Sequence, residues 1–251
     1  MSKKQPEKNL SKRQLMREQR AQKERQQRLI TIGAIVVIGL VLVAVIIIPT
    51  VQRAVAPAGD FEQVTPVSYS QIDGTIMGNP QAKVKIELFE DFKCSACKSY
   101  WKDVEPRVIK EIVEPGKAYY VFYQFPFLDD RLEVKDSDQA AQAAECAAEQ
   151  NRFWNFKDML FTNLNFVAGE FSDVRLSAFA KSLGLDMEQF DACYAEKRYQ
   201  AKIDEDGELG DNMGVAGTPS VFVNGKEVSP GRVPTFEQIL QMVDEALASG
   251  G

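Results

Sequence analysis

The sequence predicts an α/β domain that follows a single N-terminal transmembrane helix. Two observations lead to this prediction. Residues 29–49 contain no charged side chain, and residues 80–251 show the order strand, helix, strand, then a helical block, then two strands and a helix. The composition, with 45% hydrophobic and 26% charged residues, is that of an ordinary globular protein. The part of the chain behind the apolar run can therefore bury a core.

The charge of the chain changes sign after residue 28. Residues 1–28 contain ten Lys and Arg against three Asp and Glu, a net charge of +7, whereas residues 29–251 carry −13. By the positive-inside rule we expect residues 1–28 to be a basic cytoplasmic head and everything beyond the apolar run to lie outside the cytoplasm. The acidic main body makes nucleic acid an unsuitable partner.

Residues 29–49 are long enough to be a transmembrane anchor. Twenty-one residues rising 1.5 Å each give a helix of roughly 30 Å, the thickness of the hydrocarbon layer. A buried core helix is one alternative, although the run has no polar face. A cleavable signal peptide is another, because Ala54, Ala56 and Ala58 follow the run. Its apolar region is only about 7–15 residues long, so we expect an uncleaved anchor in the cell membrane.

The anchor is followed by a linker and then by the first strands of the domain. Residues 50–79 have mixed polarity with scattered Pro, Gly and Ser, which predicts a flexible extracytoplasmic linker with at most one short strand. Val84–Phe92 is a β run, Lys93–Val113 has helical spacing of its apolar residues, and Ala118–Phe125 is an aromatic, β-branched strand. We expect a β-α-β unit at the start of the domain, residues 80–251.

A helical insertion is predicted over about residues 136–210. One helix is expected to start near Ser137 and to include Cys146, Phe153 and Trp154. Another is expected to start at Asp186, with Gln189 three residues later as in a capping box.

The last part of the domain is predicted to be a hairpin and a helix. Ser220–Val223 and Lys226–Val228 flank Asn224-Gly225, a dipeptide typical of tight hairpin turns. Thr235–Ala248 has the apolar spacing of an amphipathic helix.

The sequence contains no histidine, and this excludes several classes of enzyme. Ser-His-Asp and Cys-His hydrolases, His-ligated haem proteins and the usual catalytic zinc sites all need an imidazole. The chemistry therefore has to come from other groups. The four cysteines are Cys94, Cys97, Cys146 and Cys193, and outside the cytoplasm an even number favours disulfide chemistry.

Cys94-Ser95-Ala96-Cys97 lies where a predicted strand meets a predicted helix. The free N–H groups at a helix N-terminus stabilise a thiolate, so Cys94 is expected to be the nucleophile. Cys97, one turn deeper, is expected to resolve the mixed disulfide that Cys94 forms with a substrate. Two alternatives are a structural disulfide and half of a Cys₄ zinc site, but zinc modules usually repeat the short C-x₂-C spacing. We expect no metal and no cofactor.

Three motifs in order resemble those of the DsbA-like thiol–disulfide oxidoreductases, in their membrane-anchored bacterial branch. They are GNPQAKV at 78–84, EDFKCSAC at 90–97 and GVAGTPSVFVNG at 214–225. The resemblance covers about residues 78–249 and implies a thioredoxin fold with a helical insertion. It also implies that Pro219 is a cis-proline facing the CxxC and that the Thr218 backbone pairs with an extended substrate.

The sequence departs from these relatives in three ways. Ser95 replaces the proline that often follows the first cysteine, and the CxxC contains no histidine. Leu88 stands where relatives carry a buried acid that helps to move protons. Glu87 and Glu90 are neighbours that could replace it, although exposed carboxylates are common on strands.

Cys146 and Cys193 have a different expected role. A structural disulfide between two helices of the insertion is the favoured interpretation, and two free buried thiols are the alternative.

The sequence thus predicts a membrane-tethered thiol–disulfide oxidoreductase that introduces disulfides into exported cysteine-containing proteins. The resemblance implies that a quinone-linked membrane oxidase recycles the CxxC. An extracytoplasmic reductase or isomerase using the same site is the first alternative, and a non-catalytic peptide-binding module is the second. Only a reduction potential separates the first two.

Overall fold

The computed structural model describes residues 12–55, 58–69, 71–129, 135–167 and 169–250. The chain divides into two units, Met1–Ala56 and Pro57–Gly251, and each is described by itself.

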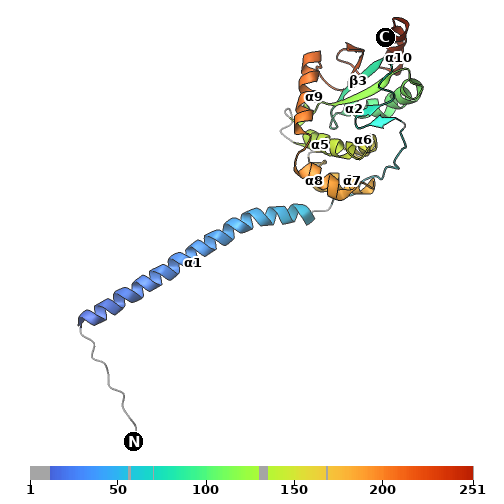
Figure 1. The fold of residues 1–251 in the computed structure, drawn as a ribbon. Coiled ribbons are helices and arrows are strands. Elements are labelled where there is room, and N and C mark those ends of the chain that lie inside the picture. Colours follow the sequence, from blue (N-terminus) through green and yellow to red (C-terminus); the bar gives the residue numbers. More distant parts are fainter. Residues whose placement is uncertain (1–11, 56–57, 70, 130–134, 168, 251) are drawn as a thin grey trace. The chain divides into compact units, whose positions relative to one another are not determined.

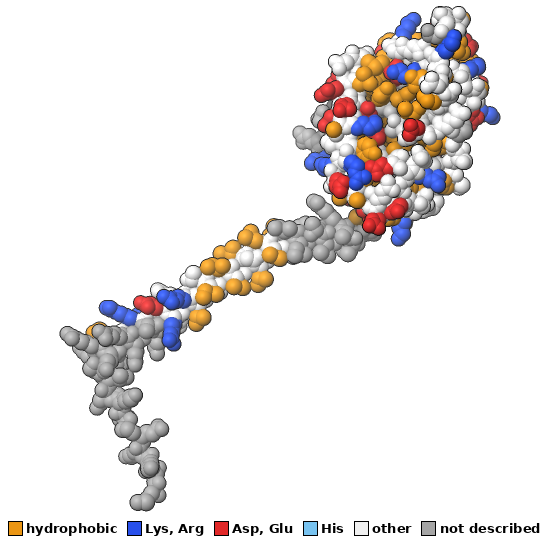
Figure 2. All heavy atoms as spheres, in the orientation of Figure 1, with side chains coloured by type: hydrophobic (Ala, Val, Ile, Leu, Met, Phe, Trp, Pro, Cys, Tyr) orange, Lys and Arg blue, Asp and Glu red, His pale blue; other side chains and the backbone are white. Residues whose placement is uncertain are grey.

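The first unit is the helix α1, Lys12–Val55. Within it, Lys23–Val45 is long and apolar enough to cross a membrane, and its side chains are not buried against other parts of the protein. Figure 2 shows Lys and Arg side chains on the N-terminal side of the apolar stretch. A core helix of a soluble domain would bury its apolar face, so this helix is compatible with a membrane anchor.

The second unit begins earlier than the sequence predicts. Residues 58–69 pack on the domain instead of forming a free linker: the ring of Phe61 lies 5.0 Å from that of Phe179, and the side chain of Asn163 pairs with both backbone groups of Glu62. Two short strands, β1 (Ile72–Asp73) and β2 (Ile76–Met77), follow. The packed unit therefore extends N-terminally beyond residue 80, because Phe61, Val64 and Tyr69 pack against the hydrophobic core.

Six strands form one mixed sheet in the order β1-β2-β4-β3-β5-β6. The remaining strands are β3 (Lys85–Glu90), β4 (Tyr119–Gln124), β5 (Ser220–Val223) and β6 (Lys226–Glu227). The central strands β3 and β4 are parallel, with Leu88 opposite Phe122, and all other neighbours are antiparallel. β3 is buried along almost its whole length because helices cover the sheet.

The single helix predicted over 93–113 is divided into three pieces. They are α2 (Ser95–Asp103), α3 (Glu105–Val108) and a π-helical turn, η1 (Ile109–Val113). Pro106 has no N–H to donate to the preceding turn, which explains the break after Asp103.

The insertion contains α5 (Asp136–Ala148), α6 (Phe153–Thr162), α7 (Asp173–Ser182), α8 (Met187–Ala195) and α9 (Gln200–Met213). The helix expected to contain Cys146, Phe153 and Trp154 is two helices, because Asn151 adopts a left-handed conformation at φ 54° between them. Asp186 accepts hydrogen bonds from the backbone of Glu188 and Gln189 and starts α8. Figure 1 shows α5–α8 gathered on one side of the sheet.

The C-terminal elements lie where the sequence predicts them. Asn224 and Gly225 take the positive φ values of a hairpin turn between β5 and β6. Helix α10 (Phe236–Ala248) begins with a complete capping box between Thr235 and Gln238. The strand and helix order confirms the predicted α/β class.

Candidate active site

The CxxC lies at the N-terminus of α2, directly behind the end of β3. Cys94 is the N-cap residue in an extended conformation, and Cys97 is in the first turn of the helix. Both are free thiols. Cys97 is fully buried and Cys94 is only 9% exposed, so the nucleophile expected from the sequence is less open to solvent than an N-terminal helix position implies.

The surroundings of Cys94 stabilise its thiolate. Its pKa is lowered from 9.0 to about 6, mainly because the Cys97 thiol donates a hydrogen bond to it and also because the backbone N–H groups of Cys97 and Ala96 point at it. Burial acts in the opposite direction. The pKa of Cys97 is raised well above its ordinary value, chiefly by burial. At neutral pH the reduced pair is therefore a thiolate at Cys94 beside a thiol at Cys97.

Thr218 and Pro219 form the wall opposite the CxxC. The peptide bond between them is cis, and the Cys94 sulfur lies 3.2 Å from the Thr218 carbonyl oxygen, to which it donates a hydrogen bond when it is protonated. A groove of about 200 Å³ lies beside this contact, between Ala96 on one side and Thr218, Pro219 and Val233 on the other. The structure thus brings together the four residues that the sequence assigns to the site.

Of the two carboxylates considered as proton carriers, only Glu90 faces the cysteines. It is fully buried, and one of its oxygens forms an ion pair with the Lys157 ammonium at 3.0 Å. Its pKa is raised from 4.5 to about 8, chiefly by burial and in smaller part by the negative charges of Glu105 and Cys94, while the Lys157 ammonium acts in the opposite direction. Glu87 instead pairs with Lys85 at 2.6 Å and accepts the backbone N–H of Gly225.

Glu90 shares a buried cation with a second acid. The Lys157 ammonium on α6 lies 3.0 Å from Glu90 and binds Glu105, and it is fully buried. Tyr120 also donates a hydrogen bond to Glu105, over 3.1 Å. The single positive charge of Lys157 neutralises one carboxylate, so the cluster has no net charge only when one of the two acids is protonated. The raised pKa of Glu90 agrees with this protonation. The sequence does not predict this cluster; its one signal there is the lysine inside the apolar stretch FWNFKDMLF of α6.

Asp91 holds the turn between β3 and α2. Its carboxylate accepts hydrogen bonds from the backbone of Lys93 (2.7 Å) and Leu128 (3.0 Å) and from the Ser137 hydroxyl (2.7 Å). Burial nevertheless raises its pKa to about 6. The turn that positions Cys94 is thereby tied to the first helix of the insertion.

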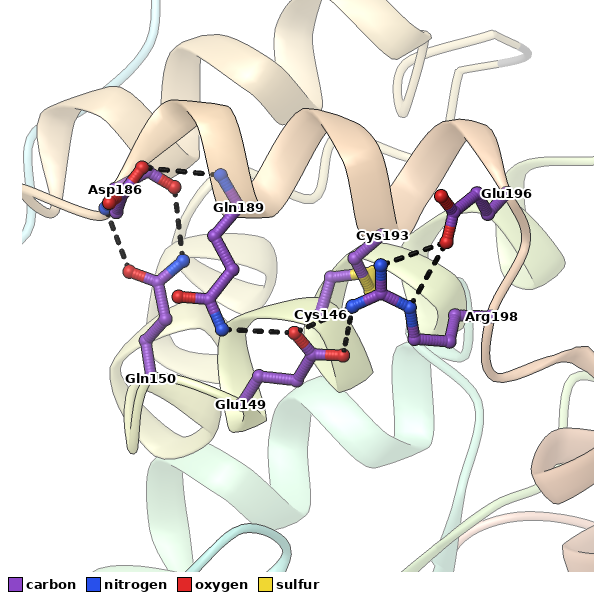
Figure 3. The surroundings of a disulfide bond; sticks show 8 residues. All are labelled: Cys146, Glu149, Gln150, Asp186, Gln189, Cys193, Glu196 and Arg198. Carbon is purple, nitrogen blue, oxygen red and sulfur yellow. Dashed lines mark hydrogen bonds and ion pairs between the residues drawn. A yellow bond between two sulfur atoms is a disulfide. The ribbon is translucent and has the colours of Figure 1, made fainter.

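Cys146 and Cys193, which are 47 positions apart in the chain, form a disulfide that joins α5 to α8. Figure 3 shows the polar contacts around it: Arg198 binds Glu149 and Glu196, each at 2.8 Å, and Gln150 pairs with the backbone of Asp186. A Cys₄ zinc site would need both of these sulfurs as thiolates, so the pairing leaves it without two ligands.

Comparison with known proteins identifies the family to which the chain belongs. The model of the thioredoxin family matches residues 70–245. A protein named probable disulfide bond formation protein D from Bacillus cereus is 33% identical over 176 residues, which are 68% of this chain and 77% of the relative.

Two solved structures share the fold. BdbD from Bacillus subtilis in its oxidised form superposes with a TM-score of 0.61 at 22% identity, over 76% of this chain and all of that one. Wolbachia pipientis α-DsbA1 gives a TM-score of 0.60 at 20% identity, over 73% of this chain and 97% of that one. The chain therefore belongs to the thioredoxin family, among the disulfide bond formation proteins of DsbA-like type, and is a thiol–disulfide oxidoreductase.

Proposed function

We propose that this protein is a membrane-tethered oxidase that introduces disulfides into exported proteins through Cys94 and Cys97. The observation that supports the oxidising direction is the stabilised Cys94 thiolate, with its pKa near 6. A stabilised thiolate favours the reduced form of the enzyme, which makes the oxidised form a stronger oxidant.

The proposed reaction moves two electrons from a substrate dithiol to the CxxC. A substrate thiolate attacks Cys94 in the Cys94–Cys97 disulfide, the bond between the two enzyme sulfurs breaks, and Cys97 leaves as a thiolate. The second substrate thiolate then attacks the substrate sulfur of the mixed disulfide, a substrate disulfide forms, and Cys94 leaves as a thiolate. Of the two protons that the substrate thiols lose, one ends on Cys97 and the other passes to solvent.

We assign to Glu90 the proton transfer to Cys97. The Cys97 thiolate is buried and unfavourable, as its raised pKa indicates. Glu90, with a pKa near 8, is protonated at neutral pH and is electrostatically coupled to Cys97. It can donate a proton as Cys97 leaves and recover one afterwards.

The substrate is proposed to pair with the Thr218 backbone as an added strand beside Cys94. The groove lined by Ala96, Thr218 and Pro219 would hold the extended chain next to the backbone with which it pairs. The Cys94 sulfur lies 3.2 Å from the Thr218 carbonyl oxygen, so a chain that pairs with the Thr218 backbone would run close to this sulfur.

The location proposed for the enzyme rests on α1. The ten basic residues before the apolar stretch favour a cytoplasmic N-terminus, so the catalytic domain would face exported proteins. A quinone-linked oxidase in the same membrane is proposed to take the two electrons from Cys94 and Cys97. The thiol–disulfide exchange proposed for this protein requires no cofactor bound to the protein itself.

The reduction potential of the Cys94–Cys97 pair tests the direction of the reaction. We expect equilibration with a glutathione buffer to give a value less negative than the about −180 mV of protein disulfide isomerase and closer to the about −120 mV of a strong oxidase. A value near about −270 mV, as in thioredoxin, would favour the reductase alternative. Failure of the oxidised protein to oxidise any dithiol would favour the non-catalytic peptide-binding module.

A further inference from the structure

Two buried acids and one buried lysine from three different elements form a cluster that interacts electrostatically with the CxxC. Glu90 comes from β3, Glu105 from α3 and Lys157 from α6. None of the three residues is more than 3% exposed. Glu90 has a proposed part in the reaction, whereas the cluster gives no role yet to Glu105.

The contacts of the two acids differ. Glu105 accepts hydrogen bonds from the Lys157 ammonium and from the Tyr120 hydroxyl, the latter over 3.1 Å. Glu90 contacts the same ammonium through Oε2 at 3.0 Å, and its Oε1 has no hydrogen-bond partner among the described residues. Hydrogen bonds donated to a carboxylate stabilise its charged form. The contacts therefore favour a charged Glu105 and leave the proton on Glu90.

Lys157 is the one cation among the described groups that act on Glu90. The other ionisable groups that interact with Glu90 are thiols, phenols and an acid: Cys94, Cys97, Tyr100, Glu105 and Tyr120. Asp158, the residue after Lys157, also interacts with this lysine. Its carboxylate is held by hydrogen bonds from Trp101 over 2.7 Å and from Tyr69 over 2.8 Å. Glu90 and Glu105 are thus the two acids that share the ammonium.

We propose that Glu105 is a positioning residue for the reaction, because it keeps Glu90 protonated by occupying the single buried ammonium of Lys157. This rests on the proton transfer to Cys97 that is proposed above for Glu90. Two neighbouring carboxylates beside one cation in a buried site are unlikely to be charged together, so a charge on Glu105 disfavours a charge on Glu90. Paired carboxylates in other active sites share one proton for the same reason.

Loss of the charge on Glu105 should make Glu90 the charged partner of Lys157. In Glu105→Gln the ammonium has Glu90 to itself at 3.0 Å, and the pair is neutral when Glu90 is ionised. Glu90 then gives up its proton at a lower pH and is no longer the proton donor for Cys97 at neutral pH. The variant keeps one acid for one cation, so it is expected to fold.

The protonation state of Glu90 can be measured at Cys94. The charge of Cys94 raises the pKa of Glu90, so a charge on Glu90 must raise the pKa of Cys94 in return. The rate at which iodoacetamide alkylates Cys94 follows its thiolate fraction. Cys97 does not contribute, because burial raises its pKa well above the ordinary value. This measurement needs no substrate and does not depend on the direction of the redox reaction.

The test uses the reduced full-length protein in detergent micelles. Glu105→Gln removes the charge at residue 105, Glu105→Asp keeps it, and Glu90→Gln imitates a protonated Glu90. The matched control is Glu145→Gln, which neutralises another buried acid, 2% exposed, that binds Lys202 at 3.1 Å instead of Lys157. Alkylation of Cys94 is followed as a function of pH in all five proteins.

We expect Glu105→Gln to move the alkylation curve to higher pH and to lower the rate about fivefold at pH 6, where the Cys94 of the wild type is half ionised. The curves of Glu90→Gln and Glu145→Gln should match the wild type, and that of Glu105→Asp should lie close to it.

A second measurement connects the cluster to the reaction. The rate of oxidation of a two-cysteine peptide, divided by the thiolate fraction of the peptide, should decline near pH 8 in the wild type as Glu90 loses its proton. In Glu105→Gln the decline should occur at lower pH. The rate at pH 7 should then be about as slow as in Glu90→Gln.

An unchanged Cys94 curve in Glu105→Gln would overturn the proposal, because Glu90 would then keep its proton without Glu105. An equal shift in Glu105→Asp or in Glu145→Gln would also overturn it, since packing and not the charge at residue 105 would be the cause. A shifted Cys94 curve with an unshifted peptide profile would contradict a role of either acid in the reaction. If the wild type oxidises no dithiol, the oxidase function fails, and the Cys94 curves still decide whether Glu105 keeps Glu90 protonated.

Discussion

The sulfur of Cys94 lies 3.2 Å from the carbonyl oxygen of Thr218, across 124 positions of the chain. The contact exists because β3 and β5 are antiparallel neighbours, with Phe89 opposite Ser220. The end of β3 that leads to Cys94 therefore lies beside the start of β5, which Thr218 and Pro219 precede. The sheet brings Cys94 together with the backbone that is proposed to pair with the substrate.

The lowered pKa of Cys94 makes the stability of the reduced protein depend on pH. The pKa is about 6 in the folded state against 9.0 as the ordinary value, so the folded state binds fewer protons at Cys94 between these pH values. Its contribution to the free energy of unfolding should grow, on the order of 3 kcal/mol, from pH 6 to pH 9 and be lost as pH falls through 6. Urea denaturation of the wild type and of Cys94→Ala, both under reducing conditions, measures this difference. Parallel curves for the two proteins would contradict it.

Glu90 should have the opposite pH dependence. Burial raises its pKa to about 8, so the folded state keeps a proton that the unfolded state has lost above about pH 4.5. The stability linked to this group therefore falls as pH rises from 4.5 to 8. In Glu90→Gln this fall should disappear, while the attack of a substrate thiolate on Cys94 at pH 7 slows about tenfold or more, because Cys97 leaves without a proton.

Glu87→Gln is the matched control for Glu90→Gln. Glu87 lies on the same strand but binds Lys85 and the Gly225 backbone. Its removal should leave the reaction rate and its pH profile unchanged. If both variants slow the reaction equally, the slower rate comes from a disturbance of strand β3 and not from the loss of a proton donor at Glu90.

Lys157 should be essential for stability. Replacing it with Met leaves Glu90 and Glu105 buried without their cation, which should lower the free energy of unfolding by about 3–5 kcal/mol. The double variant Lys157→Met/Glu105→Gln removes one of the two uncompensated acids, and Glu90 can stay protonated. Urea denaturation should show that it recovers most of the loss. A double variant as unstable as the single one would contradict the charge argument.

The features of this site that could be predicted from the sequence are those formed by residues that lie close together along the chain. The CxxC at the start of a helix was predictable, because β3 and α2 follow each other along the chain. The position of Thr218 and Pro219 followed only from the resemblance of three motifs. Pro106 is a helix breaker that the sequence shows, whereas the helical spacing of apolar residues over 93–113 continues through it. The burial of Glu90 was not predictable, since it depends on Lys157 from a helix sixty-seven positions later.

The packing of residues 58–69 on the domain could not be predicted from the sequence either. Its polarity is that of a linker, and its fixed position comes from distant partners, such as the Asp158 carboxylate that accepts a hydrogen bond from Tyr69 over 2.8 Å. The same carboxylate accepts one from Trp101 on α2, over 2.7 Å. Contacts of this kind depend on the tertiary fold.

The disulfide between Cys146 and Cys193 should stabilise the fold without taking part in the reaction. Closing a loop of this length contributes about 4 kcal/mol through the unfolded state. The double variant Cys146→Ala/Cys193→Ala should therefore melt at a lower temperature, yet oxidise dithiothreitol at the wild-type rate. Thiol counting checks the pairing: the oxidised, denatured variant Cys94→Ala/Cys97→Ala should show no free thiol. Two free thiols would show that the pair does not form.

The central claim, that Cys94 is the sulfur that forms the mixed disulfide with a substrate and Cys97 is the one that can displace the substrate from it, is tested most directly by trapping mixed disulfides in cells. Cys97→Ala leaves the low-pKa sulfur at the helix N-terminus without the thiol that releases its partner. We expect this variant to accumulate covalent adducts with exported cysteine-containing proteins, visible on non-reducing gels and removed by dithiothreitol, and Cys94→Ala to accumulate almost none. If Cys97→Ala traps nothing, or if Cys94→Ala traps as much, Cys94 is not the nucleophile and the account of this site is wrong.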